Sequence, residues 1–210
     1  PSKVLSVNYH LTRQCNYSCK FCFHTATTSF VLPLEDAKRG LDLLKAEGCK
    51  KINFSGGEPF ITQRGKYLGE LCRHSKTIGL ATSIISNGSL ITREWMQEYG
   101  KFVDILGVSC DSGKTETLHA MGREQVGKDH IKSLRNVRAW CKEFGVGFKV
   151  NTVVTSLNNL EDMSSLMAEL GPMRWKVFQC LLIQGENQAS GGQSALRDAT
   201  TMVVSGEAFK

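Results

Sequence analysis

The hydrophobic and polar residues of this chain follow two different periods, and the two periods alternate from one segment to the next. Segments with the features of strands are Leu5–Thr12, Lys51–Ser55, Ala81–Ser86, Ile105–Cys110, Gly147–Val154 and Arg174–Cys180. Segments with the features of helices are Leu34–Glu47, Arg64–Lys76, Thr92–Tyr99, Ile131–Phe144 and Glu161–Leu170. Because each helix separates two strands, the pattern predicts a parallel sheet with helices packed outside it.

Four of the predicted strands have one polar and one apolar face, since side chains alternate across a strand. A parallel strand covered on both faces would be apolar almost throughout. The polar positions are Ser6, Asn8, His10, Thr12, Lys51, Asn53, Ser55, Lys149, Asn151, Arg174 and Lys176. The pattern therefore favours an α/β fold that forms a partial, wide TIM-like barrel, with helices on the apolar faces and a wet interior. An open doubly wound sheet and a solvated antiparallel sheet are the alternatives.

Four of these polar residues are cations, and a barrel would bring them into one cavity: Lys51, Lys149, Arg174 and Lys176. Unpaired cations in an enclosed space repel one another and lose hydration, and no carboxylate alternates with them on those faces. A bound polyanion would relieve both costs, and Lys and Arg are common phosphate ligands. We therefore expect the interior to bind a nucleoside triphosphate.

Composition indicates a single domain over residues 1–210, because the chain is short and 41% of its residues are hydrophobic. The net charge is +6 without any long block of like charges, which gives no indication of a nucleic-acid partner. There is no signal peptide and no apolar run of about 18 residues, so the sequence predicts a cytoplasmic protein without a membrane span. The abrupt beginning at Pro1 and the helix-like end at Lys210 are typical of a part of a longer chain.

Three cysteines, Cys15, Cys19 and Cys22, lie in one short loop after the first predicted strand. Three thiolates at this spacing can hold three corners of an iron–sulfur cube and leave the fourth iron open to a ligand. A zinc site with His24 as fourth ligand is the alternative, although no second cysteine pair is present. The other five cysteines are scattered singly, which argues against disulfides and for a reducing compartment.

A second motif, Ser55-Gly56-Gly57-Glu58-Pro59, follows the second predicted strand. Its glycines permit unusual backbone conformations and the close approach of a ligand, and Glu58 could accept hydrogen bonds from an amine. The simpler interpretation is a tight turn that ends in a surface carboxylate. Asn87 and Ser109 stand at strand ends and are weaker candidates for ligand contacts. Residues that fit solvated surface or loop positions are His24, His119, Arg123 and His130.

The cysteine triplet and the glycine turn together resemble the radical S-adenosylmethionine superfamily, and within it the viperin family of nucleotide dehydratases. The similarity runs from about Val7 to Asn187. The blocks that carry it are Asn8-Tyr9-His10, Thr12-Arg13-Gln14-Cys15-Asn16-Tyr17, Phe21-Cys22-Phe23-His24-Thr25, Lys51-Ile52-Asn53-Phe54-Ser55-Gly56-Gly57-Glu58-Pro59-Phe60, Ser86-Asn87-Gly88-Ser89-Leu90-Ile91 and Arg174-Trp175-Lys176-Val177-Phe178-Gln179-Cys180-Leu181-Leu182-Ile183.

This resemblance implies a partial (βα)6 barrel that holds a [4Fe–4S] cluster and S-adenosylmethionine. Cys15, Cys19 and Cys22 would ligate the cluster and serve the catalysis. Glu58 matches the segment that holds the methionine amine, and Ser109 and Arg123 match positions that hold its carboxylate. The full set of expected S-adenosylmethionine contacts is Phe21, Gly56, Gly57, Glu58, Asn87, Ser109 and Arg123.

The resemblance also implies a reaction. A 5′-deoxyadenosyl radical would remove the ribose 4′ hydrogen of CTP, and loss of the 3′ hydroxyl would give 3′-deoxy-3′,4′-didehydro-CTP, a chain terminator of antiviral defence. The expected nucleotide contacts are Asn8, Lys51, Ser55, Lys149, Asn151, Arg174 and Lys176. UTP stays open as an alternative substrate, and the electron donor is unknown. Membrane association, at the endoplasmic reticulum or lipid droplets, would require the family's N-terminal helix, which this sequence lacks along with the C-terminal extension.

Two departures from the family concern the loop around Arg123: Gly113 replaces an expected aromatic residue, and residues 122–126 lack the expected Gly-Arg-Gly. Two other functions stay open beside the dehydratase. A GTP cyclase of molybdenum-cofactor biosynthesis would need a second cluster site, and no second cysteine triplet is present. A scaffold would use the cluster only for folding. Formation of product from a nucleotide distinguishes the dehydratase from both.

Overall fold

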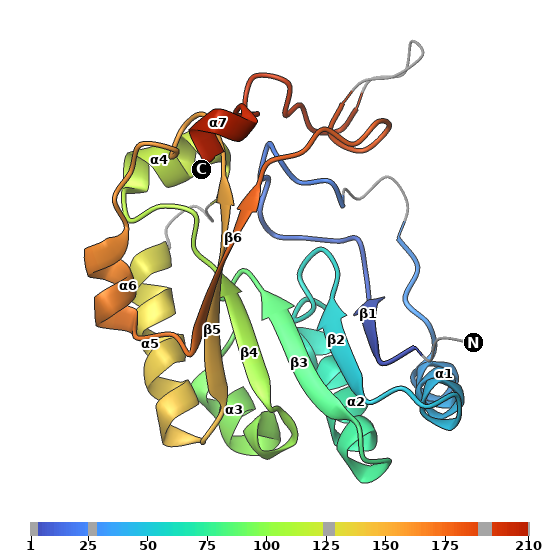
Figure 1. Cartoon of the computed structure of the whole chain (residues 1–210). Coiled ribbons are helices and arrows are strands. Elements are labelled where there is room, and N and C mark those ends of the chain that lie inside the picture. The colour runs from blue at the N-terminus through green and yellow to red at the C-terminus, as the bar shows by residue number, and fades with distance from the viewer. Residues whose placement is uncertain (1–3, 25–28, 124–128, 189–194, 210) are drawn as a thin grey trace.

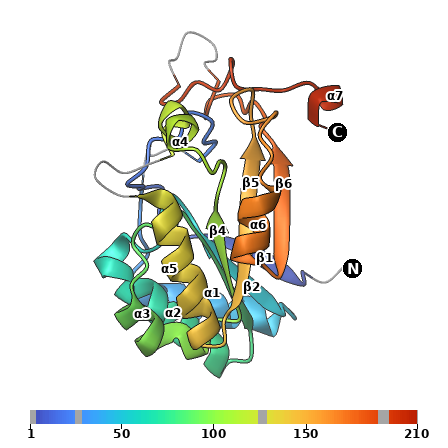
Figure 2. The same ribbon diagram turned by 90° about the vertical axis from the view of Figure 1, so that its left-hand side faces the viewer.

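The computed structural model describes residues 4–24, 29–123, 129–188 and 195–209. Six parallel strands form one sheet in the spatial order β1-β2-β3-β4-β5-β6. The strands are β1 (Ser6–His10), β2 (Lys51–Ser55), β3 (Ala81–Ser86), β4 (Ile105–Ser109), β5 (Gly147–Val154) and β6 (Arg174–Gln179). Since the order never reverses, the crossovers place their helices on one side of the sheet, which curves into a half-barrel (Figures 1 and 2). The barrel prediction is confirmed, and a doubly wound sheet, which reverses its order, is wrong.

The helices are α1 (Leu34–Ala46), α2 (Lys66–Thr77), α3 (Arg93–Tyr99), α4 (Thr115–Met121), α5 (His130–Glu143), α6 (Ser164–Leu170) and α7 (Gly206–Phe209), with two short 3-10 turns over Thr62–Gly65 and Gly100–Phe102. The sequence did not predict α4, because this short helix buries only Leu118 and Met121 and has no clear period. The predicted helix over 161–170 begins three residues late, where Asp162 accepts a hydrogen bond from the Ser164 N–H. No helix in the described parts of the chain is long and apolar enough to cross a membrane.

The hydrophobic core lies between the outer face of the sheet and the helices. Alternate residues of β2 point into it, and Ile52 and Phe54 are completely buried. From the helix side, Ala37 and Leu41 of α1 are also buried. Side-chain alternation thus divides β2 between a dry outer face and an inner face that none of the described helices covers (Figure 2).

The last strand departs from this division. Trp175 and Val177 lie on the outer face of β6, yet they are 40% and 44% exposed. The expectation of a helix-covered apolar face is therefore wrong for β6. The physical reason is that β6 is an edge strand, and the described residues between it and α7 form no helix that could cover it.

Candidate active site

The inner face of the half-barrel carries the polar residues that alternate along the strands. In β5 and β6, Lys149 pairs with Arg174 and Asn151 with Lys176, so these four side chains share one face. In β1 and β2, the same face carries Asn8, His10, Lys51, Asn53 and Ser55. The structure therefore brings the seven predicted nucleotide contacts onto one face, and their binding role stays a prediction.

The charge on this face is unbalanced. Burial, and after it the nearby charges of Lys176, Lys51 and Arg174, together lower the pKa of Lys149 to about 8. Within the described part of the chain, no carboxylate forms an ion pair with any of these four cations. The Oδ1 atom of Asn151 is buried among them without a hydrogen-bond partner. The unbalanced cations indicate a site for an anion, and the Asn151 oxygen can accept a hydrogen bond from a donor group of the same ligand.

The glycine turn after β2 supports the cysteine loop through backbone contacts. The Gly57 N–H donates to the Thr12 carbonyl at 2.7 Å, and the Glu58 N–H donates to the Gln14 carbonyl at 2.8 Å. A Cβ at Gly57 would come within 2.0 Å of the Gln14 carbonyl oxygen. Another segment of backbone thus passes directly over Gly57 and leaves no room for a side chain there, and the approach of a ligand to the glycines stays a prediction.

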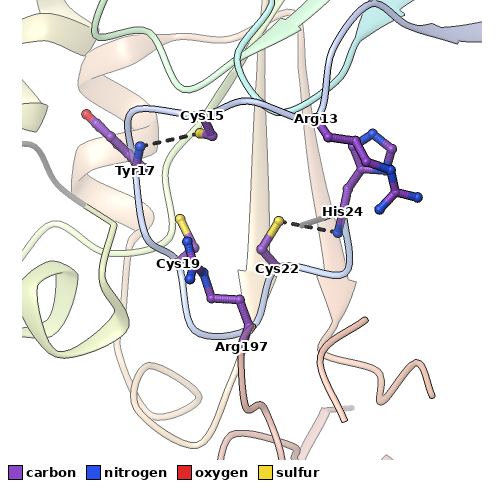
Figure 3. Close-up of a pocket in the computed structure, with 7 residues that line it drawn as sticks. All are labelled: Arg13, Cys15, Tyr17, Cys19, Cys22, His24 and Arg197. Atoms are coloured by element: carbon purple, nitrogen blue, oxygen red, sulfur yellow. Dashed lines mark hydrogen bonds between the residues drawn. The ribbon is translucent and has the colours of Figure 1, made fainter. Parts of the chain in front are cut away.

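The three cysteines line one pocket beyond the carboxyl ends of the strands (Figure 3). The Cys15 sulfur accepts a hydrogen bond from the Tyr17 N–H at 3.4 Å, and the Cys22 sulfur accepts one from the His24 N–H at 3.4 Å. Burial raises the pKa of Cys19 to about 12, so without a metal this thiol stays protonated at neutral pH. A bound metal stabilises the thiolate instead, because coordination deprotonates thiols.

The donor set fits an iron–sulfur cluster better than a zinc ion. Among the described residues, no three His, Cys, Asp or Glu side chains converge tightly enough to hold a single metal ion. When three cysteines hold a cubane, each thiolate binds a different iron. The three cysteine sulfur atoms therefore stand farther apart than they would around a single metal ion. His24, the fourth ligand of the zinc alternative, instead packs against His10 with ring centroids 4.3 Å apart and ring planes tilted by 49°, and its Nε2 has no partner.

Glu58 is completely buried, so its interpretation as a surface carboxylate is wrong. Its carboxylate accepts hydrogen bonds from the Ser86 hydroxyl at 2.8 Å, the Asn87 N–H at 2.7 Å and, more weakly, the Phe60 N–H at 3.2 Å. Burial raises the pKa of Glu58 to about 7 despite these bonds. The carboxylate ties the glycine turn to the end of β3 and so positions Asn87, whose Nδ2 lies 3.9 Å from the Cys15 sulfur.

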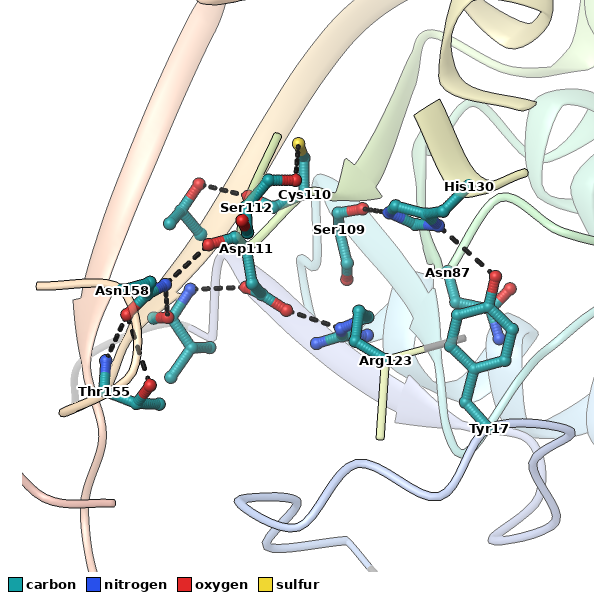
Figure 4. Close-up of polar contacts among 12 residues, drawn as sticks. Tyr17, Asn87, Ser109, Cys110, Asp111, Ser112, Arg123, His130, Thr155 and Asn158 are labelled. Carbon is teal, nitrogen blue, oxygen red and sulfur yellow. Dashed lines mark hydrogen bonds and ion pairs between the residues drawn. The ribbon is translucent and has the colours of Figure 1, made fainter. Parts of the chain in front are cut away.

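Arg123 is buried, so its interpretation as a solvated loop charge is also wrong. Its Nε donates to the fully buried carboxylate of Asp111, which also accepts a hydrogen bond from the Val153 N–H at 2.7 Å (Figure 4). The guanidinium lies 5.1 Å from the centroid of the Phe21 ring, a cation–π contact. Phe21 and Arg123 thus come together beside the cysteine loop. Two departures from the family pattern were noted in the sequence. At the first, the Gly113 N–H donates to the Glu161 carboxylate; at the second, residues 124–126 lie outside the described residues.

His130 was expected on the surface, but it is buried at the start of α5. Its Nε2–H donates to the Ser109 carbonyl at 3.0 Å, which leaves Nδ1 to accept from the Tyr17 hydroxyl at 3.3 Å. Burial lowers the pKa of His130 to about 4, so the ring is neutral. It connects the end of β4, where Ser109 lies, to the cysteine loop (Figure 4).

Sequence reasoning missed several residues at the pocket. Arg13, Tyr17 and Arg197 line it with the cysteines. Arg13 and Tyr17 are close to the cysteines in sequence, so their position alone could have identified them as residues that line the pocket. No sequence signal connects Arg197 to the cysteine loop, since Arg197 joins the lining of this pocket only when the chain beyond β6 returns to the mouth of the barrel.

Comparison with known proteins agrees with this arrangement. The model of the radical SAM superfamily matches residues 9–170. The S-adenosylmethionine-dependent nucleotide dehydratase RSAD2 of Danio rerio is 55% identical over 208 residues, which are 98% of this chain and 57% of that protein. The S-adenosylmethionine-dependent nucleotide dehydratase of Selenomonas ruminantium is 34% identical over 194 residues, which are 87% of this chain and 69% of that protein.

Among solved structures, Streptococcus suis SuiB bound to S-adenosylmethionine superposes with a TM-score of 0.71 at 20% identity, over 91% of this chain and 44% of that one. This likeness concerns the fold alone. The chain spans 57–59% of the Danio rerio and Oncorhynchus mykiss dehydratases. With its three-cysteine pocket at the mouth of a parallel half-barrel, the chain belongs to the radical SAM superfamily.

Proposed function

We propose that this chain is the catalytic domain of a radical S-adenosylmethionine nucleotide dehydratase, which converts CTP, or UTP, to the 3′-deoxy-3′,4′-didehydro nucleotide. The observation that carries the proposal is the position of the unbalanced cations on the inner face, below a mouth that bears three cysteines. The curated relatives bear the name nucleotide dehydratase, which gives the same reaction class.

The cysteines and their neighbours fit the two cofactors of the superfamily. When bound, a [4Fe–4S] cluster and S-adenosylmethionine supply a 5′-deoxyadenosyl radical. Cys15, Cys19 and Cys22 would hold the cluster. Asp111 fixes Arg123 through Nε, so the terminal nitrogens of the guanidinium are available for the carboxylate of S-adenosylmethionine.

The inner face supplies the substrate site in this proposal. Lys149, Arg174 and Lys176 would bind the triphosphate, which removes their mutual repulsion. The unpaired Oδ1 of Asn151 would accept a hydrogen bond from the nucleoside. Phosphates held at this depth leave the ribose closer to the mouth, where it can meet the radical.

The test is product formation by the anaerobically reconstituted protein with reductant, S-adenosylmethionine and CTP, UTP, GTP or ATP in turn. We expect nucleotide-dependent 5′-deoxyadenosine and transfer of deuterium into it from a pyrimidine nucleotide labelled at C4′. Activity with GTP alone would instead support a cyclase. An intact cluster without any nucleotide-dependent cleavage would contradict an enzymatic role and favour a scaffold.

We also propose that the protein works in the cytosol with an electron donor still to be identified. All eight cysteines are free thiols, which is typical of a reducing compartment. Cell fractionation with a cytosolic marker would check this location.

A further inference from the structure

Each of the three cysteines is held by a different part of the chain. The segment before Cys15 pairs with the glycine turn, as described above. The backbone around Cys19 pairs with the end of α4, where the Ser18 N–H donates to the Gly122 carbonyl at 3.2 Å and the Lys20 N–H to the Met121 carbonyl at 3.0 Å. Cys22 is joined to the Cys19 segment by a bond within the loop, from the Cys22 N–H to the Cys19 carbonyl at 3.2 Å.

A second anchor beside Cys22, from outside the loop, comes from beyond β6. Asn187 has no exposed surface, and its Nδ2 donates to the carbonyl of Phe21, the residue before Cys22, at 3.0 Å. The same Nδ2 donates to the Leu181 carbonyl at 3.0 Å, and Oδ1 accepts from the Ile183 N–H at 2.7 Å. One amide thus satisfies two carbonyls and one N–H, and it connects the chain after β6 to the cysteine loop.

Neighbouring contacts hold the same junction together. Glu186 forms an ion pair with Arg13 at the other end of the cysteine loop, at 2.9 Å. The Ala199 N–H donates to the Asn187 carbonyl, and Ala199 packs in a small apolar cluster with Cys19 and Phe21. Because these contacts flank a buried amide, the Phe21 carbonyl has little freedom to turn.

We propose that Asn187 is a positioning residue for Cys22: its buried amide fixes the Phe21 carbonyl and thereby the direction of the neighbouring thiolate. The inference rests on the proposed cluster site and adds a residue 165 positions away from its cysteine. Asn187 would not touch the cluster itself. It would act by keeping the third thiolate ready to bind its iron.

The test uses Asn187→Asp, which has nearly the same shape, keeps the acceptor for Ile183 and loses both N–H donors. Asn158 provides a matched control, because its Nδ2 donates to the Asp111 and Val153 carbonyls and its Oδ1 accepts from the Thr155 N–H (Figure 4). Asn158→Asp therefore loses the same kind of bonds away from the cysteine loop. If the Asp variant does not fold, Asn187→Ser takes its place in the test, because serine has a smaller side chain and adds no charge.

Three quantities are measured on each reconstituted protein without S-adenosylmethionine: iron per folded chain, the rate of cluster loss to a chelator, and the electron paramagnetic resonance spectrum of the reduced cluster. We expect similar decreases in the thermal midpoint of the metal-free Asp variants. Only the Asn187 variants should lose the cluster at least about tenfold faster and show a changed spectrum, since one thiolate is no longer directed.

A wild-type rate and spectrum in Asn187→Asp would overturn the inference, as would equally fast loss from Asn158→Asp, which would indicate lowered stability alone. Failure of the proposed function is distinguishable. A wild-type protein that holds its cluster but converts no nucleotide would contradict the dehydratase and leave the role of Asn187 intact. A wild-type protein that takes up no cluster would overturn both.

Discussion

The two faces of the β-sheet show how one alternating pattern separates stability from chemistry. On the outer face, Phe54 is completely buried under helices and contributes to the core. Asn53, the residue before Phe54 in β2, points to the inner face. It is only partly buried, and its side-chain amide donates to the side-chain oxygens of Ser6 and Asn8. The inner cations gain nothing from one another, whereas the buried apolar side chains of the outer face gain from their neighbours in the core. The comparison teaches that the inner face is maintained at a cost to stability, as binding sites commonly are.

The largest effect should come from the outer face. We expect Phe54→Ala to lower the free energy of unfolding by about 3–5 kcal/mol, because it leaves a cavity in a close-packed core. Chemical denaturation monitored by circular dichroism measures it. Asn53→Ala, one residue along the same strand, is the control and should cost about 1 kcal/mol through lost hydrogen bonds. Equal losses in the two variants would remove the distinction between the faces.

The next effect concerns binding at the inner face. Lys149→Ala or Arg174→Ala should weaken binding of CTP about 10–100-fold, since each removes a charge-assisted contact to phosphate. Stability should stay the same or rise slightly because repulsion among the cations decreases. Isothermal titration calorimetry measures the affinity. Arg135→Ala is the control, as this exposed cation pairs with Glu169 on the helix side. Unchanged binding in both inner-face variants would contradict the triphosphate site.

Glu58 should give a smaller effect with a characteristic pH dependence. Its pKa is raised from 4.5 to about 7 by burial, so the folded protein holds its proton more tightly than the unfolded chain does. The stabilisation linked to this proton is complete below about pH 4.5 and is lost as the pH rises through 7. Glu58→Gln should remove this slope and cost about 1 kcal/mol through one mismatched hydrogen bond. Denaturation midpoints measured from pH 4.5 to 8 check it, and an unchanged slope in the variant would show that another group titrates.

The smallest effect is the titration of Lys149. Its pKa is lowered from 10.5 to about 8, so the unfolded chain binds more protons between these values and stability rises over this range of pH. Phosphate binding should weaken over the same range as the charge is lost. Lys149→Arg keeps its charge and should keep a flat affinity up to pH 9, measured with CTP by calorimetry. The same decline in the Arg variant would assign the titration to another group.

The sequence predicted whatever depends on near neighbours along the chain. The cysteine spacing, the glycine turn and the alternation in β2 and β5 are local patterns, and the structure places each where the pattern indicated. The convergence of Lys51 with Arg174 also followed, because parallel strands with a fixed period of two can place their polar faces only on the same side.

The tertiary structure alone decided which polar groups are buried and what each one meets. Arg123, Glu58 and His130 have ordinary surface character in the sequence, but loops from distant strands close over them and supply their partners. Asn187 is the extreme case, since its bond to the Phe21 carbonyl exists only after the barrel has formed. The physical reason is that periodicity along a strand sets the direction of a side chain, whereas burial and hydrogen bonding depend on which remote segment arrives there, and no local pattern records that.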